Sequence, residues 1–348
     1  MKPSFIICSF LVPLLIVVIL VKQVSAEPTL TIEHDSQEEL KIQWAGGIIQ
    51  QTSDLKKWTD INPQPSTIFT IDGSDDKNFY RVLSQDSVPI IAFTGQSNTL
   101  HIRRNYEPYS TTPLDFHFAL TVGNIDASAG TPQYYSSLQT AIMAGQSVGS
   151  AWEFASLLKD SEYRKGSITR FAIAQSGKGG QPSRKWKSGS TRHIEFEANI
   201  DGLIEQLQTI PHTTGHLAAV VVNQGERDTD TGGDTWAENW TSFITTVRNK
   251  YGNQVQIYVQ TLNGIHLMPR QQNPHPGWET VRSQQLALAT GSGSILELPD
   301  VFVFDSNALG GPENTAVYVR DNNVHYSDAG IEQLANGTFN LFKVANAF

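Results

Sequence analysis

From residue 88 to the end of the chain, short apolar runs alternate with longer stretches in which apolar and polar residues are mixed. A continuous apolar run rich in β-branched residues is typical of a strand buried on both faces, and the mixed stretches between such strands are typical of covering helices. The pattern therefore predicts an α/β architecture, with a parallel sheet covered by helices on both sides. The predicted strands span residues 90–94, 168–174, 217–223, 255–260 and 301–304, and the predicted helices span residues 148–159, 195–208, 236–250, 278–289 and 327–344.

Residues 27–86 show a different pattern, in which short runs with alternating apolar and polar positions are separated by Gly, Asn, Pro and Asp. Such punctuation is typical of antiparallel strands joined by turns. We predict a small antiparallel β module here, and it resembles modules attached to secreted proteins that act on polysaccharides. Two interpretations of Trp44 and Trp58 stay open: they contact carbohydrate, or they form the core of the module.

The first 26 residues contain Lys2, an apolar run from Phe5 to Val21, and small residues that end at Ala26. This arrangement predicts a signal peptide that is cleaved after Ala26, and hence a secreted or periplasmic protein. The apolar run is long for a signal peptide, so an uncleaved membrane anchor is the alternative.

Polar residues follow three of the predicted strands directly: Gly95 to Asn98, Gly177 to Gly180, and Asn223 to Glu226. The carboxyl ends of parallel strands lie at one edge of a sheet, where α/β proteins place their sites. Ser97 lies in the first of these turns, and His325 precedes the last predicted helix. A serine and a histidine so placed predict a nucleophile and its general base, although a serine after a strand can also cap a helix. We expect residues 100–147 to form a wall or lid above them.

Taken together, four motifs resemble those of the SGNH hydrolases, within them the sialate O-acetylesterase and acetylxylan esterase group, which includes carbohydrate esterase family six. The motifs are GQSN at residues 95–98, GGQPSRKW at 179–186, QGERD at 224–228 and VRSQ at 281–284. The resemblance covers residues 87–348. It implies a three-layer α/β/α, flavodoxin-like SGNH hydrolase fold, and a serine ester hydrolase that removes acetyl groups from sugars through an acyl-enzyme.

The chain departs from the family pattern at the acid that orients the histidine. In that family the acid lies three residues before the histidine, but here that position is Asn322, and the nearest carboxylate is Asp321. An asparagine cannot stabilise an imidazolium as a carboxylate does. Three alternatives follow: Asp321 orients His325, Glu226 does so or buttresses its own loop, or the enzyme uses a Ser-His dyad.

The resemblance also implies an oxyanion hole, which requires preorganised donors for the charge that develops on the carbonyl oxygen. The candidates are the backbone N–H groups of Ser97 and Gly180 and the side-chain amide of Gln224. Candidates for substrate contacts are Gln96, Asn98, Trp186 and Arg282. Trp186 is equally well explained as a buried residue, and Arg282 as a member of an ion pair.

Composition narrows the choice of partners and cofactors. The net charge of −9 over 348 residues argues against nucleic acid as a partner, because its recognition rewards clustered Lys and Arg. Cys8 is the only cysteine, the nine histidines are dispersed, and glycine-rich phosphate or dinucleotide loops are absent from the sequence. We therefore expect no metal and no cofactor. The family resemblance implies an acetylated carbohydrate as substrate, and we expect a monomer. The competing functions are an esterase for simple acyl esters or lipids and a catalytically lapsed carbohydrate-binding protein.

Overall fold

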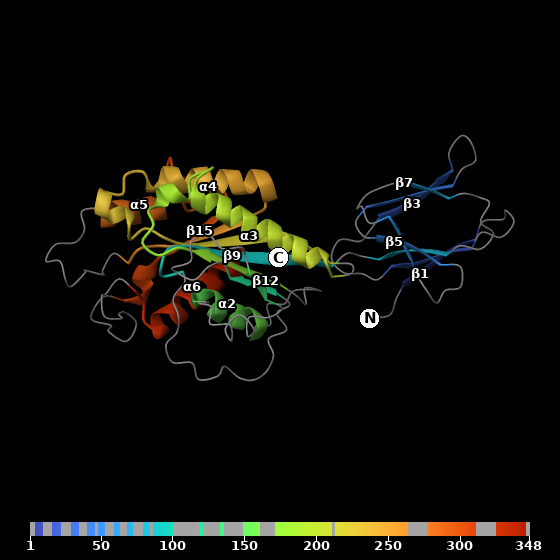
Figure 1. Ribbon diagram of the computed structural model, residues 1–348, viewed down its shortest axis with the longest axis horizontal. Coiled ribbons are helices and arrows are strands. Elements are labelled where there is room, and N and C mark those ends of the chain that lie inside the picture. Colours follow the sequence, from blue (N-terminus) through green and yellow to red (C-terminus); the bar gives the residue numbers. More distant parts are fainter. Residues whose placement is uncertain are drawn as a thin grey trace. The chain divides into compact units, whose positions relative to one another are not determined.

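A computed structural model of the 348-residue chain is shown in Figure 1. It describes residues 4–9, 16–21, 29–34, 40–45, 48–52, 59–62, 68–71, 79–83, 86–99, 118–121, 133–135, 149–160, 171–210, 213–263, 277–310 and 325–345. Two compact units make up the chain, one mainly of residues 1–87 and one mainly of residues 88–348. Within these described ranges, no helix has both the length and the apolar character needed to cross a membrane.

Strands of the first unit pair antiparallel in three small sheets. The first sheet contains β1 (Ser4–Ser9) and β2 (Ile16–Val21), the second β3 (Thr29–His34), β4 (Leu40–Ala45) and β7 (Ile68–Ile71), and the third β5 (Ile48–Thr52), β6 (Thr59–Asn62) and β8 (Phe79–Leu83). β1 and β2 lie in the segment for which the sequence predicts a signal peptide. Export and cleavage after Ala26 stay predictions, and the side chains of Trp44 and Trp58 lie outside the described part of the chain.

The second unit is built on a seven-stranded sheet with the order β11-β10-β12-β9-β13-β14-β15. These strands are β9 (Asp86–Gly95), β10 (Phe118–Thr121), β11 (Gln133–Tyr135), β12 (Ala172–Gly177), β13 (Thr213–Asn223), β14 (Gln256–Gln260) and β15 (Val301–Phe304). β12 pairs parallel with β9, and β13, β14 and β15 pair parallel with one another. β12, the next long strand after β9 in the sequence, lies on one side of β9, and β13 lies on the other side. The direction in which strands are added to the sheet therefore reverses at β9.

Helices cover both faces of this sheet (Figure 1). They are α2 (Gly149–Asp160), α3 (Thr191–Gln208), α4 (Trp236–Tyr251), α5 (Trp278–Ala287) and α6 (Asp328–Val344), with short 3-10 helices at Ser183–Lys185, Asp228–Thr231 and Ser306–Leu309. In β9, Ile90 and Ala92 are buried with residues of α3, α4 and α5, whereas Ile91 and Phe93 are buried with residues of α2 and α6. The two-residue period of a strand thus supplies both apolar layers, and the predicted three-layer α/β/α fold is confirmed.

Two details of the sheet differ from the sequence prediction. β12 ends at Gly177, three residues after the end of the predicted apolar run, because Gln175, Ser176 and Gly177 continue the pairing with β9. Gln175 is polar and yet buried, and its Nε2 donates to the Thr99 carbonyl. Within residues 100–147, β10 and β11 add to the edge of the sheet. The rest of that segment lies outside the described residues, so its role as a wall or lid stays a prediction.

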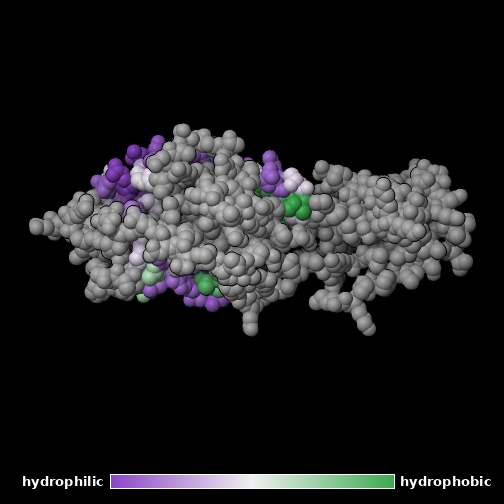
Figure 2. All heavy atoms as spheres, turned by 60° about the horizontal axis from the view of Figure 1, so that its bottom comes forward, coloured by the Kyte–Doolittle hydropathy of each residue, from purple (hydrophilic) through white to green (hydrophobic). Residues whose placement is uncertain are grey.

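The described surface is mainly polar. In the face shown in Figure 2, most coloured residues are hydrophilic, and the hydrophobic ones do not form a continuous area. Large exposed apolar side chains among the described residues are Ile194, Ile295, Leu296 and Val344. Scattered apolar residues of this kind are normal on a soluble surface and indicate no binding face.

Candidate active site

The turn after β9 brings the ends of β9 and β13 unusually close. Gly95 has a φ of +137°, and a Cβ atom added to it would lie 2.0 Å from the Asn223 carbonyl oxygen. The next residue, Gln96, donates its backbone N–H to that same oxygen at 2.9 Å. Only glycine tolerates both this conformation and this contact. The position of Ser97 is therefore fixed at the point where the strand order reverses, which is where α/β sheets bind ligands.

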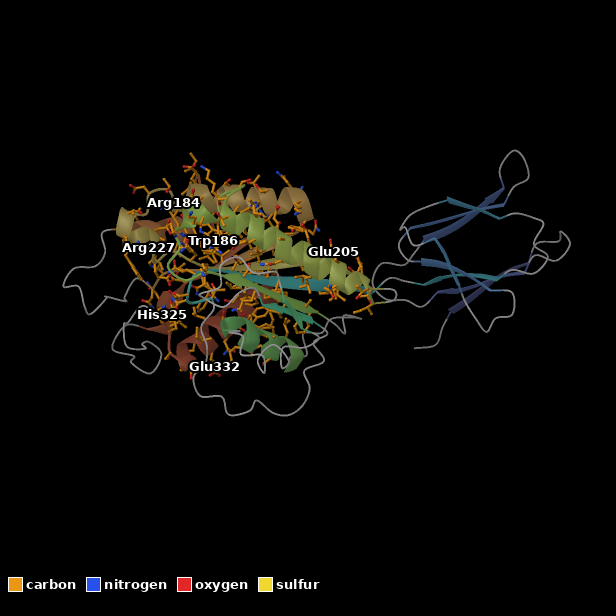
Figure 3. All side chains as sticks on the ribbon, in the orientation of Figure 1. Arg184, Trp186, Glu205, Arg227, His325 and Glu332 are labelled. Carbon is orange, nitrogen blue, oxygen red and sulfur yellow. The ribbon has the colours of Figure 1, made fainter. Side chains whose placement is uncertain are left out.

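Ser97 and His325, 228 residues apart in the sequence, meet at this turn. The His325 Nε2 lies 2.9 Å from the Ser97 Oγ, and both side chains are partly exposed to solvent. This distance is within the reach that proton transfer from a nucleophile to its base requires. Figure 3 shows His325 at the end of the sheet where Arg227 also lies, away from Glu205 on α3.

Asp321, the first candidate for orienting His325, lies outside the part of the chain that the structure describes. Both Asp321 and Asn322 belong to residues 311–324, which are outside the described part of the chain. Asp321 therefore stays a prediction.

Gln224 has all its side-chain polar atoms engaged by other protein groups. Its Oε1 accepts from the indole Nε1 of Trp236 at 2.6 Å and of Trp240 at 3.1 Å, and its Nε2 donates to Asp228. Further contacts join this Nε2 to the Gln181 carbonyl at 3.1 Å and to the Gln96 Oε1 at 3.4 Å. Because two indoles can only donate, they fix which end of the amide is oxygen. To donate to an oxyanion, Gln224 would have to release one of these acceptors.

Asp228 joins the second motif to the third. Both of its carboxylate oxygens accept from the Ser183 backbone N–H, and its Oδ1 also accepts from the Ser183 Oγ at 2.6 Å. Asn239 completes this arrangement, since its Nδ2 donates to the Ser183 Oγ. Charge-assisted bonds of this kind are stronger than neutral ones, so Asp228 holds the glycine-containing turn in place.

Glu226 is buried beside the nucleophile turn. Its Oε1 accepts from the Asn98 Nδ2, and its Oε2 is buried with no hydrogen-bond partner among the described residues. Burial raises the pKa of Glu226 to about 7, and the nearby charge of Asp228 acts in the same direction. The backbone N–H groups of Glu226 and Gly225 and the Asn98 amide oppose this rise without cancelling it. Gln96, Asn98, Gln224, Glu226 and Asp228 are called the strand-end network below.

The backbone candidates for the oxyanion hole lie in open positions. Gly180 is exposed, has a φ of +67°, and would have no atom within 4 Å of an added Cβ. Ser97 follows the strained Gly95 turn directly. Gly180 is thus exposed to solvent, and Ser97 is partly exposed.

All four residues expected to touch substrate are buried. Trp186 is 1 % exposed; its Nε1 donates to the Thr94 Oγ1 at 3.0 Å, and its ring stacks on Trp240. The interpretation as a sugar platform fails because a ring without an exposed face cannot stack on a sugar. Its alternative, burial, holds.

Arg282 is 6 % exposed and binds protein atoms at the ends of β14 and β15. It donates to the Thr261 Oγ1, to the Leu262 carbonyl and to Asp305 at 2.8 Å. Burial alone would raise the pKa of Asp305. The hydrogen bond and the charge of Arg282, together with a hydrogen bond from the Asn307 N–H, instead hold this pKa below its usual value. The ion-pair alternative for Arg282 therefore holds, and substrate contact does not. Gln96 and Asn98, 3 % and 1 % exposed, are likewise almost inaccessible.

Tyr326, Trp236 and Trp240 also bind the site residues, although no sequence motif included them. The tryptophans lie four residues apart on α4, a spacing that places both on one helix face, and this was a usable signal. Tyr326 contributes its backbone N–H, which donates to the Asn98 Oδ1 at 3.3 Å, and a backbone contact leaves no mark on the sequence. Within the described residues, no cluster of His, Cys, Asp and Glu side chains could hold a metal ion.

Comparison with known proteins gives a family and several similar folds. A family model described as "Carbohydrate esterase, sialic acid-specific acetylesterase" matches residues 89–337. A comparison with curated protein sequences gives no match.

Among solved structures, a protein from Arabidopsis thaliana is 16 % identical with a TM-score of 0.48, covering 75 % of this chain and 99 % of its own. A carbohydrate acetylesterase from Xanthomonas citri is 13 % identical with a TM-score of 0.41, covering 89 % and 73 %. The aryl esterase of M. smegmatis is 15 % identical with a TM-score of 0.37, covering 74 % and 99 %. The family assignment rests on the family model and not on these structures.

Proposed function

Because this chain belongs to the carbohydrate esterase family of sialic acid-specific acetylesterases, and is thus an ester hydrolase, we propose that it removes O-acetyl groups from carbohydrates by a serine mechanism. The observation that carries the mechanism is the distance of 2.9 Å between the Ser97 Oγ and the His325 Nε2 at the strand ends. The partly exposed positions of both side chains support access of a substrate.

In this mechanism the Ser97 Oγ attacks the acetyl carbonyl carbon while His325 takes the hydroxyl proton. Collapse of the tetrahedral intermediate breaks the ester bond, and the sugar oxygen leaves with the proton from His325. Water then attacks the acetyl-serine, again with His325 as the base, and releases acetate. The backbone N–H groups of Ser97 and Gly180 are the first candidates for binding the oxyanion. Gln224 joins them only if its amide gives up a protein acceptor.

Acetate release tests the substrate class. We expect acetate from at least one of acetylated xylan, O-acetyl sialic acid and acetylated algal polysaccharides, and faster hydrolysis of p-nitrophenyl acetate than of the butyrate or octanoate ester. Ser97→Ala should abolish turnover with an unchanged melting temperature, whereas Ser292→Ala, which alters an exposed serine far along the sequence, should change nothing. Preference for octanoate would assign the protein to simple acyl esters or lipids instead, and absence of any turnover would favour a lapsed carbohydrate-binding protein.

Asp321 completes the proposal as the residue that orients His325. Replacing it by Asn should lower kcat by up to about 10,000-fold, as expected when the acid of such a triad loses its charge. Asp328→Asn is the matched control, since Asp328 lies in the first turn of α6 close to His325 in the sequence. A loss below about tenfold in Asp321→Asn would favour a Ser-His dyad or Glu226.

Export from the cytoplasm is the remaining part of the proposal. The apolar run followed by small residues at the N-terminus supports cleavage after Ala26. Mass spectrometry of protein secreted by an expression host should give a mature chain that begins at Glu27. A mass that includes residues 1–26 in the membrane fraction would support the uncleaved anchor.

A further inference from the structure

Asn98 lies at the junction of three segments. It follows Ser97 directly in the turn after β9, its Nδ2 donates to Glu226 in the turn after β13, and its Oδ1 accepts from the Tyr326 N–H at 3.3 Å. Tyr326 in turn follows His325 directly. The buried side-chain amide of Asn98, which itself belongs to the nucleophile turn, therefore binds both the third motif and the residue after the general base.

Glu226 differs from Asp228, the neighbouring carboxylate of the same motif. Asp228 uses both of its oxygens to bind Ser183 and Gln224, as expected of a buried carboxylate that stabilises the fold. Asn98 is the one side chain that donates to Glu226 among the described residues, and it does so at Oε1, while Oε2 is buried without a hydrogen-bond partner there. The other groups that stabilise this carboxylate are the backbone N–H groups of Gly225 and Glu226. A buried carboxyl group is costly, so the bond to the Asn98 amide is the feature that distinguishes the role of Glu226 from that of Asp228.

We propose that Asn98 and Glu226 form a positioning pair, in which Glu226 fixes the Asn98 amide, and Asn98 fixes the Tyr326 backbone and thereby the His325 imidazole against Ser97. The proposal rests on the proposed serine mechanism and deepens it. Neither residue touches substrate, since both are almost fully buried. Glu226 acts here as a hydrogen-bond acceptor and not as a charge that stabilises the imidazolium. This separates the positioning pair from the alternative that Glu226 is the acid of the triad.

The acceptor role gives an experiment with opposite outcomes for the two alternatives. Glu226→Gln keeps a side-chain oxygen that can accept from Asn98 but removes the negative charge. Glu226→Met introduces a side chain of similar length that has neither the oxygen nor the charge. We expect kcat for p-nitrophenyl acetate within about threefold of wild type in Glu226→Gln and about 100-fold lower in Glu226→Met, because small displacements of reacting groups cost rates of this size. KM should stay within about threefold in both, since uniform binding is unaffected.

Asn98→Leu should lower kcat by about as much as Glu226→Met, and the double variant should be no worse than Asn98→Leu alone, because residues that act through one contact are not additive. Thr99→Val is the matched control: the neighbouring Thr99 is equally buried and bonds to the Thr94 and Asn223 carbonyls, but its hydroxyl has no link to Tyr326. It should lose stability while kcat changes by less than about threefold.

Three results would overturn the proposal: equal large losses in Glu226→Gln and Glu226→Met, unchanged kcat in Asn98→Leu, or additive losses in the double variant. If Asn98→Leu does not melt cooperatively, Asn98→Ser replaces it, since its shorter side chain cannot reach both partners; unchanged kcat there also overturns the proposal. Hydrogen exchange adds a direct measurement, because the Tyr326 amide should exchange faster in Asn98→Ser than in Thr99→Val. Ser97→Ala in the same assay distinguishes failure of the positioning pair from failure of the serine mechanism. If Ser97→Ala stayed active, the serine mechanism itself would be wrong.

Discussion

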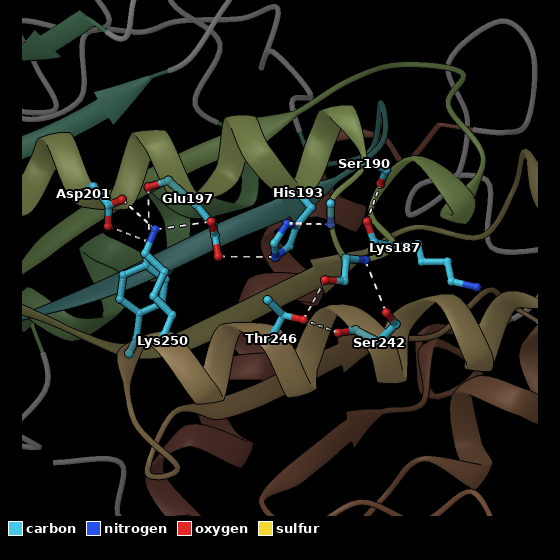
Figure 4. A network of polar contacts seen from close by, with 11 residues as sticks. Lys187, Ser190, His193, Glu197, Asp201, Ser242, Thr246 and Lys250 are labelled. Atoms are coloured by element: carbon cyan, nitrogen blue, oxygen red, sulfur yellow. Dashed lines mark hydrogen bonds and ion pairs between the residues drawn. The ribbon is translucent and has the colours of Figure 1, made fainter.

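Two polar networks of the second unit contain similar residues in opposite environments. In the strand-end network, the five side chains are at most 7 % exposed, and a single amide of Gln224 binds two indoles and a carboxylate. On the outside of α3 and α4, Lys250 binds Glu197 at 3.2 Å and Asp201 at 2.7 Å, and Glu197 also lies 3.4 Å from His193 (Figure 4). The Lys250 and Asp201 side chains are 36 % and 44 % exposed. Glu197, Asp201 and Lys250 are called the helix-surface network below, and His193 is left out of it because it is buried.

The comparison shows that the number of polar contacts does not measure their importance. Water replaces a lost partner in the helix-surface network, so each contact adds little to stability. Water cannot reach the strand-end network, so a lost partner leaves a buried group unpaired at a cost of about 1–3 kcal/mol. The proposed positioning pair, Asn98 and Glu226, belongs to this buried network. The four predictions that follow compare the two regions.

Two glycines with positive φ give the largest expected contrast. Gly95→Ala would place a Cβ 2.0 Å from the Asn223 carbonyl, so we expect a loss of on the order of 4 kcal/mol or more in the free energy of unfolding, or no folded protein. Gly189, with a φ of +75°, binds His193 through its N–H but has no atom within 4 Å of an added Cβ. Gly189→Ala should cost only about 1–2 kcal/mol. Urea unfolding measures both, and equal losses would contradict the contrast.

Gln224→Leu should destabilise the fold by on the order of 3–5 kcal/mol, because it leaves the buried Nε1 groups of Trp236 and Trp240 without an acceptor and removes a donor to Asp228. Ser242→Ala on the exposed side of α4 removes a contact to the Ser188 N–H and should change stability by less than about 0.5 kcal/mol. Chemical unfolding of both variants at one pH gives the comparison. A similar midpoint for Gln224→Leu and wild type would show that the indole contacts do not stabilise the fold.

Glu226→Gln should show a pH-dependent gain in stability. The folded-state pKa of Glu226 is raised from 4.5 to about 7. The contribution of Glu226 to the free energy of unfolding is therefore fully present below about pH 4.5 and is lost as the pH rises to about 7. Glutamine does not ionise, so the unfolding free energy of the variant relative to wild type should rise by on the order of 3 kcal/mol between pH 4 and pH 8.

Glu238→Gln on α4 is the control for this pH series. Its hydrogen bond with Lys187 lowers the pKa of Glu238, so the wild-type residue contributes stability above its unfolded pKa that is lost as the pH falls. The change should therefore be small and of opposite sign, since this pair is solvated. Parallel curves for the two variants would contradict the assigned pKa of Glu226.

Lys250→Ala has the smallest expected effect. Although Lys250 binds two carboxylates, its loss should change the unfolding free energy by at most about 1 kcal/mol, because the pair is exposed. The difference should shrink further in high salt, which screens surface charges. Unfolding at low and high ionic strength provides the measurement, and a loss of several kcal/mol independent of salt would mean that the helix-surface network behaves like the buried one.

The sequence by itself determined the layers and the order of the site segments. Apolar runs placed the strand ends, and the carboxyl ends of parallel strands share one edge for any sequence that forms such a sheet, so Ser97 and Asn223 were placed at the same edge. That β9 and β13 are neighbours there is a result of the strand order. The end of β12 was predicted three residues too early, because the strand continues through polar residues that a hydrophobic pattern does not detect. The positions of Ser97 after a strand and of His325 before the last helix suggested the pair, and the family resemblance strengthened that prediction, but no local pattern fixes the contact between residues that lie 228 apart.

Only the tertiary structure decided which polar residues face solvent and which face one another. Trp186 was equally consistent with substrate contact and with burial, whereas the alternatives for Arg282 were substrate contact and an ion pair. The structure stacks Trp186 on Trp240 and pairs Arg282 with Asp305. The Asn98 amide found its partners in Glu226 and in the backbone of Tyr326, whose N–H is the same in every sequence. The physical reason is that hydrophobic periodicity is a one-dimensional signal carried by many residues, whereas a buried hydrogen bond depends on the meeting of two single atoms in three dimensions.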